Sequence, residues 1–170
     1  ICNVAGVADG WRGGIFAAAA AAHLWRLSGW RGQLILGSPI LWILHLGYLW
    51  LVVGFGLRAI ALLSGAINET TALHGLGLGA AGSMIVGVMS RASLGHTGRP
   101  LQAPAPIVAS YVLISVAALI RIAGPALLPQ FYGELIVTAG ALWCLAFAIF
   151  FVVFWPILTL PRPRPDGPTT

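Results

Sequence analysis

The sequence predicts an all-α fold, a polytopic integral membrane helix bundle of about five transmembrane helices. Hydrophobic residues make up 59% of the chain and charged residues only 8%, whereas a soluble domain carries about a quarter of its residues as charge. The mean hydropathy is correspondingly high, at +0.94. Apolar segments also alternate with short polar turns along most of the chain. So few ions cannot cover a water-exposed surface, but a helix in a bilayer needs no such cover.

The charged residues restrict the function further. The net charge of +5 comes from nine arginines, because the chain contains no lysine. These arginines are scattered near the ends of apolar segments, which is typical of topology signals and not of a nucleic-acid surface. We therefore expect the lipid bilayer, and no nucleic acid, as a partner. The apolar content also excludes a soluble enzyme.

The chain opens with a short apolar segment. Residues 1–8 cannot cross a bilayer, which takes about 20 residues, so we interpret residues 1–10 as the tail of an upstream helix and a turn at Asp9. Because the chain starts at Ile1 without a basic segment, no signal peptide is predicted. We expect further transmembrane helices of the same protein to precede it. The first complete span is predicted at about 11–27, around a run of alanines.

Three spans follow in order. The second is predicted at about 40–63, because Pro39 suits the first turn of a helix. A polar turn separates it from a third span at about 71–92. The fourth is predicted at about 107–123 and is expected to stop before Pro125, since proline interrupts helical hydrogen bonding.

The last span is predicted at about 134–155, so the bundle covers residues 11–160. Residues 161–170 are proline-rich and polar, and we expect a disordered tail there. Counting sides along the five spans places most arginines on one side, namely Arg26, Arg31, Arg91, Arg99, Arg162 and Arg164. The positive-inside rule makes this side cytoplasmic, and the C-terminus with it.

Two histidines fall within predicted spans, where an ionisable side chain is costly and usually functional. His45 lies about 9 Å inside one end of the second helix, and His74 lies near the opposite end of the third, about 18 Å away in depth. One metal ion is therefore not expected to bind both. Each is either a separate metal or haem ligand, a common role of neutral imidazole, or a hydrogen-bonding partner of a neighbouring helix.

Further candidates lie at the predicted cytoplasmic end. His23 is near the end of the first span, Arg91 ends the third, and His96 is placed in the loop that follows. Together with His45 these residues could converge on one site. Two methionines of the third helix would suit copper(I) in that neighbourhood, although methionine more often only packs.

The third helix carries a small residue at every fourth position, namely Gly75, Gly79, Ser83 and Gly87. Residues four apart share one face of a helix, so this face lacks large side chains. Such a stripe normally lets a second helix approach closely. The alternative is a flat macrocycle that lies against the backbone.

The loop after this helix has an unusual composition, with the run MSRASLGHTGRP from Met89 to Pro100. Glycines allow a tight backbone path after a helix end. Arg91, Thr97 and Arg99 can donate hydrogen bonds to an anionic ligand or a lipid headgroup. Taken by itself, the run is a weak indication of a site at the cytoplasmic face.

As a pattern the run is more specific. It follows a glycine-rich helix that begins at His74, and the segment PILWILHLGYLW at 39–50 comes before both. Together these segments resemble the NnrS family of bacterial polytopic membrane proteins, from about His23 to Arg162. Because members of that family are roughly twice as long, the resemblance implies that this chain is a C-terminal part, which acts with missing N-terminal helices.

The resemblance implies a haem- and copper-containing protein of the bacterial cytoplasmic (inner) membrane. Such a protein is linked to nitric oxide metabolism and to protection against nitrosative stress, with nitric oxide as a candidate ligand. Carried over by motif, the candidate cofactor-binding residues are His45, His74, His96, Arg91 and Arg99, and the three histidines are the candidate metal ligands. No catalytic residue is predicted, and whether the chain is an enzyme stays open.

Two other functions remain compatible with the residues. One is a membrane transporter or permease without a redox cofactor, which glycine-rich helices and polar residues in the spans would allow. Against it, the predicted spans contain no central acidic residue that could couple protons or sodium. The other is a structural or assembly module whose histidines merely pack.

Overall fold

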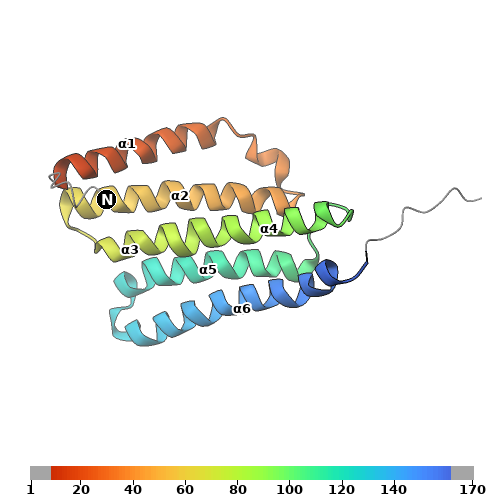
Figure 1. The fold of residues 1–170 in the computed structure, drawn as a ribbon. Helices are drawn as coiled ribbons and strands as arrows, with labels where there is room; N and C mark the ends of the chain where they lie inside the picture. The colour runs from red at the N-terminus through yellow and green to blue at the C-terminus, as the bar shows by residue number, and fades with distance from the viewer. Residues whose placement is uncertain (1–8, 162–170) are drawn as a thin grey trace, which may run out of the picture.

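The computed structural model describes residues 9–161, which form a row of antiparallel helices joined by short turns (Figure 1). The four longest helices are α1 (Asp9–Ser28), α2 (Pro39–Ser64), α5 (Ala105–Leu127) and α6 (Tyr132–Thr159). Between α2 and α5 lies one continuous rod, made of α3 (Glu69–His74), the π-helical segment η2 (Gly75–Ala81) and α4 (Gly82–His96). Short 3-10 turns, η1 (Gly32–Ile35) and η3 (Pro129–Phe131), precede α2 and α6. The predicted all-α class is confirmed.

The antiparallel order gives the bundle two different ends (Figure 1). At one end α1 and α4 finish while α2 and α5 begin. We call it the arginine end, because it carries Arg26, Arg31, Arg91 and Arg99. The predictions of an upstream helical tail over 1–8 and of a disordered tail over 162–170 lie outside the described residues.

Four helical segments are long and apolar enough to cross a membrane, namely Pro39–Ser64, Glu69–His96, Ala105–Leu127 and Pro129–Thr159. A hydrocarbon core about 30 Å thick needs about 20 such residues, so a helical membrane bundle is confirmed. α1 has 20 residues but is not among the four, because Arg12, His23 and Arg26 make it more polar. The crossing of the membrane by α1 therefore stays a prediction.

The helices extend beyond their predicted limits. α1 already begins at Asp9, so the turn predicted there is the first turn of a helix. α4 continues to His96, so residues 93–96, predicted as loop, are helical. α5 runs through Pro125 to Leu127, because a proline in the last turn removes only one terminal hydrogen bond. Longer helices also satisfy more backbone groups internally, as a bilayer requires.

The small-residue face of the rod packs against α2, as predicted. A methyl group added at Gly79 would lie 2.6 Å from the ring of Trp50, and one added at Gly87 would lie 2.9 Å from Ile43. Both distances are shorter than a normal van der Waals contact of about 3.5–4.0 Å. α2 therefore fills the space that a macrocycle would need at this face.

Trp50 explains why the middle of the rod needs a glycine. Its ring occupies the place of a side chain at Gly79, and its indole N–H points to Ser115 Oγ on α5, 3.4 Å away. Trp50 thereby bridges α2 and α5 across the rod. Only one face of η2 is packed so closely, since a Cβ at Gly77 would have no neighbour within 4 Å.

At the arginine end, buried side chains of α2, α4, α5 and α6 form a common core. Its largest fully buried side chains are Ile40, Ile43, Val86, Ile107, Tyr111, Ile114 and Phe154. α1 takes no part in this core and packs mainly on α2. The bundle is thus a compact group of four helical segments with α1 attached at one edge.

At the opposite end, an ion pair and a cation–π contact of the same arginine connect three helices. The guanidinium of Arg58 on α2 pairs with the carboxylate of Glu69 on α3. The same guanidinium lies 5.7 Å from the centre of the Phe16 ring on α1, where a cation is attracted to the face of an aromatic ring. Because Arg58 is only 13% exposed, this pairing stabilises a charge that would otherwise be costly at the membrane boundary.

We expect Gly79→Ala to destabilise the bundle and Gly77→Ala to leave it intact. The methyl group at Gly79 would overlap Trp50 and displace α2, and overpacking of this kind costs about 1–3 kcal/mol. At Gly77 the same methyl group meets open space. Thermal unfolding in detergent, followed by circular dichroism, measures the two midpoints. Equal midpoints would contradict the packing described here.

Candidate functional site

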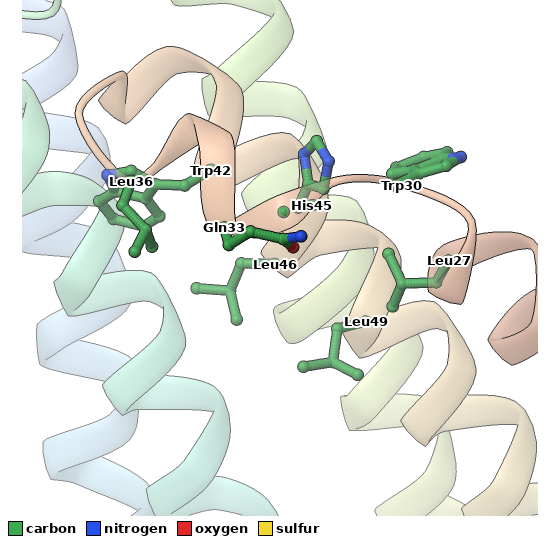
Figure 2. Close-up of a pocket in the computed structure, with 9 residues that line it drawn as sticks. Leu27, Trp30, Gln33, Leu36, Trp42, His45, Leu46 and Leu49 are labelled. Carbon is green, nitrogen blue, oxygen red and sulfur yellow. The ribbon is translucent and has the colours of Figure 1, made fainter.

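A groove lies at the arginine end, between α1 and the start of α2 (Figure 2). Its volume is about 530 Å³, within the range of about 300–1,000 Å³ that is typical of small-molecule and cofactor sites. The end of α1, the connection that contains η1 and the beginning of α2 form its walls. We call it the His45 groove, and its lining residues are Leu27, Trp30, Gly32, Gln33, Leu36, Trp42, His45, Leu46 and Leu49.

Helical periodicity and a folded connection assemble these walls. The α2 residues of the groove are spaced three or four apart and so share one face of the helix, namely Trp42, His45, Leu46 and Leu49. The connection before α2 turns back on itself, with the Gly32 amide donating to the Trp30 carbonyl at 2.7 Å. This turn places the indole of Trp30 beside His45, with 4.8 Å between the ring centres.

His45 is half-buried, and one hydrogen bond fixes where its ring carries a hydrogen. Nδ1 lies 3.0 Å from the carbonyl oxygen of Leu41. Because a carbonyl oxygen only accepts, Nδ1 is the donor, and Nε2 of the neutral ring keeps its lone pair. Metal-binding histidines commonly have this arrangement, in which a backbone carbonyl orients the ring. His45 is therefore prepared as a ligand through Nε2.

His23 and Tyr48 form a second polar contact beside the groove. His23 Nδ1 and the Tyr48 hydroxyl share a hydrogen bond of 2.6 Å that joins α1 to α2. Phe55 also stacks on His23, with 5.5 Å between the ring centres, and the ring centre of Trp30 lies 4.6 Å from that of Tyr48. Trp30 thus contacts both the ring of His45 and the ring to which His23 is bonded. Tyr48 was not among the predicted site residues, although it follows His45 by three residues on the same helix.

His96 and Arg91 line a different pocket at the same end of the bundle. This pocket has a volume of about 470 Å³. We call it the Arg91 pocket, and it is lined by Val88, Arg91, Ala92, Gly95, His96 and Leu101. It shares no lining residue with the His45 groove. His45, His96 and Arg91 thus lie at the same end of the bundle, but they do not converge on one pocket as predicted.

The other residues of the MSRASLGHTGRP run end the helix. Gly98 has a positive φ of 70°, and its amide bonds the Gly95 carbonyl at 3.2 Å while the Arg99 amide bonds the Leu94 carbonyl at 2.9 Å. This is the Schellman motif, which satisfies the last carbonyls of a helix. The Arg99 guanidinium donates to the Ile157 carbonyl on α6 at 3.2 Å. Arg99 therefore ties α6 to this turn.

His74 lies at the opposite end of the bundle from His45, as the helical rise predicts. Its Nδ1 is 2.6 Å from the carbonyl oxygen of Thr70, so its Nε2 is also free. Within residues 9–161, no three His, Cys, Asp or Glu side chains come close enough to hold a metal ion together. The three predicted metal ligands are thus placed singly, at three separate positions.

These features define a polytopic helical membrane protein with a prepared histidine in an aromatic groove at one end. The sequence matches the family described as NnrS protein over residues 2–162. The chain therefore belongs to the NnrS family, and the resemblance seen in its motifs is confirmed. No curated protein and no solved structure matches the chain.

We expect the nitrogen-15 NMR spectrum of histidine-labelled protein to show His45 as the neutral tautomer with hydrogen on Nδ1. The Leu41 carbonyl selects this tautomer. His96, which is exposed, serves as the comparison because solvent selects no single tautomer for it. The signals are assigned by His45→Gln and His96→Gln. A hydrogen on Nε2 of His45 would contradict the predicted ligand geometry.

Tyr48→Phe is expected to loosen α1. The change keeps the aromatic ring but removes the hydroxyl that His23 contacts at 2.6 Å, at a cost of about 0.5–1.5 kcal/mol. The effect is measured as faster proteolysis within α1 and as a change in tryptophan fluorescence. Fluorescence is a suitable probe because Trp30 contacts Tyr48. Tyr132→Phe, at an exposed tyrosine of α6, is the matched control and should behave like the wild type.

Proposed function

We propose that this chain binds haem in the His45 groove and serves, as part of an NnrS-type protein, in nitric oxide metabolism or in protection against nitrosative stress. The observation that carries the proposal is the free Nε2 of His45 in a groove of about 530 Å³. Membership of the NnrS family supports it, because the family resemblance implies a haem- and copper-containing membrane protein.

The residues of the groove suit a haem. An imidazole nitrogen is the commonest protein ligand of haem iron, and His45 presents one. Trp30 and Trp42 offer aromatic walls, and the leucines of the lining offer apolar contacts for a flat macrocycle. Arg31 is exposed and directly precedes Gly32 of the lining, so we propose it as the partner of a propionate.

When bound, the haem iron supplies a coordination position for nitric oxide. His45 would hold the iron through Nε2, and the hydrogen bond to the Leu41 carbonyl orients the imidazole for that role. Trp30 and Trp42 give the groove aromatic walls, which suit a small apolar ligand better than a polar one. Nitric oxide dissolves in hydrocarbon and can reach the groove from the bilayer without a polar channel.

The described residues do not fit a copper site by themselves. His74 and His96 stand near opposite ends of the α3–α4 rod, and residues 9–161 contain no cluster of three His, Cys, Asp or Glu side chains that could hold a metal ion. Met84 packs on α2, since a Cβ at Gly47 would lie 3.0 Å from Met84 Cγ. His96 shares its pocket with Arg91, whose charge would repel a cation. We therefore propose that a copper ion is held by His74 and takes its other ligands from further transmembrane helices of the protein.

We also propose that the arginine end faces the cytoplasm of a bacterial cell, so that the C-terminus is cytoplasmic. Arginines near helix ends favour the cytoplasmic side of an inner-membrane protein, and the opposite end carries the carboxylates Glu69 and Glu134. On this orientation the His45 groove opens near the cytoplasmic surface.

His45→Ala is expected to abolish most of the haem absorption of the detergent-purified full-length protein, and His74→Ala is not. Both histidines donate Nδ1–H to a carbonyl four residues earlier, but only His45 lines the groove. The readouts are haem content and the Soret band of the reduced protein, which should shift on addition of nitric oxide. Metal analysis of the same samples reports copper.

Two results would contradict the haem proposal. A well-folded wild-type preparation without haem would favour a transporter that has no redox cofactor. Equal losses of haem in His45→Ala and His74→Ala would show that the groove does not select its ligand as described. Circular dichroism of both variants confirms that the helices are formed before either result is interpreted.

A further inference from the structure

The Arg91 pocket contains two polar side chains that have no polar partner among residues 9–161. Arg91 and His96 are both exposed, and neither forms an ion pair or side-chain hydrogen bond with another residue of the described range 9–161. Nearby Arg99, in contrast, is occupied by the Ile157 carbonyl. The pocket therefore offers a guanidinium and an imidazole to a ligand from outside.

The remaining lining of this pocket is apolar. Val88 and Gly95 share a face of α4 with Arg91, because they are three and four residues from it, and Ala92 is in turn three or four residues from both of them. Leu101 closes the other side, 3.8 Å from where a Cβ of Gly95 would lie. Since Gly95 has no side chain, the space between α4 and Leu101 stays open. An anionic head with an apolar tail matches such a lining.

The depth of the pocket matches the headgroup layer of a membrane. The rod from Glu69 to His96 has 28 residues and is therefore about 42 Å long, which exceeds a hydrocarbon core of about 30 Å. Its last turns thus project into the headgroup layer, which is about 5–7.5 Å thick on each side. Arg91 lies about 7.5 Å before His96 along the axis, so the two side chains bracket this layer.

We propose that Arg91 and His96 bind the phosphate of an anionic phospholipid, whose acyl chain lies along Val88 and Leu101. The planar guanidinium of Arg91 binds two phosphate oxygens at once, and the His96 ring donates a third hydrogen bond. A helix C-terminus ordinarily disfavours an anion, but the amides of Gly98 and Arg99 already satisfy the last carbonyls here. A metal cation does not suit the pocket, because Arg91 would repel it.

Native mass spectrometry of the full-length protein in detergent tests this site with phosphatidylglycerol and phosphatidylcholine as the probes. We expect the wild type to retain phosphatidylglycerol in preference, and Arg91→Gln to weaken that retention roughly fivefold. His96→Gln should weaken it to a smaller extent. Arg26→Gln is the matched control, since Arg26 is an exposed arginine at the same end, on α1, and it should retain the lipid like the wild type.

The apolar part of the site has its own test. Leu101→Gln should weaken binding of phosphatidylglycerol while Arg91 stays in place. Inorganic phosphate should not displace the lipid at an equal concentration, because it makes no apolar contacts. Displacement by inorganic phosphate would overturn the proposal in favour of a soluble phosphate ligand.

Three further outcomes would also overturn the proposal: equal retention of both lipids, an equal loss in Arg26→Gln, or a loss of haem instead of lipid in Arg91→Gln. The last outcome would assign the Arg91 pocket to the cofactor. It differs from a failure of the haem proposal, in which His45→Ala would not selectively lose haem. If Arg91→Gln does not fold, Arg91→Lys and Leu101→Gln carry the test, since Lys keeps the charge but not the two-pronged contact.

Discussion

The close contact between α2 and the small-residue face of the α3–α4 rod is the constraint on which the other features depend. In a bilayer, apolar side chains gain little by leaving lipid, so helices associate through fitted surfaces and polar contacts. Trp50 fills the position of a side chain at Gly79 and reaches Ser115 on α5. This contact fixes the face of α2 that packs on the rod. Because of the helical periodicity, His45 and Tyr48 lie on the opposite face of α2, toward α1 and Trp30.

The arginine end therefore holds two sites of different character. In the His45 groove an imidazole is half-buried beside aromatic rings, which suits a coordinated metal and an apolar ligand. In the Arg91 pocket the charge is exposed and the walls are apolar, which favours an anion with a hydrocarbon tail. Each site contains one histidine, but the two histidines differ in burial and in partner: His45 is half-buried and bonded to the Leu41 carbonyl, and His96 is exposed.

The all-α class, the apolar spans and the separation of His45 from His74 could be predicted, because each depends only on local hydropathy or on the rise of one helix. The packing of the glycine face could be predicted for the same reason. The partners of His45 could not, since Trp30 reaches it through a folded connection whose path is set by tertiary contacts. The end of α4 was missed because glycines and a threonine suggest a loop, whereas here Thr97 and Gly98 follow a helix that continues to His96.

All residues of the His45 groove lie between Leu27 and Leu49, within a single hairpin of the chain. Forming a site from residues that are close in sequence costs little loop-closure entropy. Such a site can also form before more distant segments have been synthesised. As chains are made at about 5–20 residues per second, the hairpin can enter the membrane and close its groove while α5 and α6 are still being translated. Assembly of the groove therefore needs no residue of α5 or α6, because neither helix contributes to its lining.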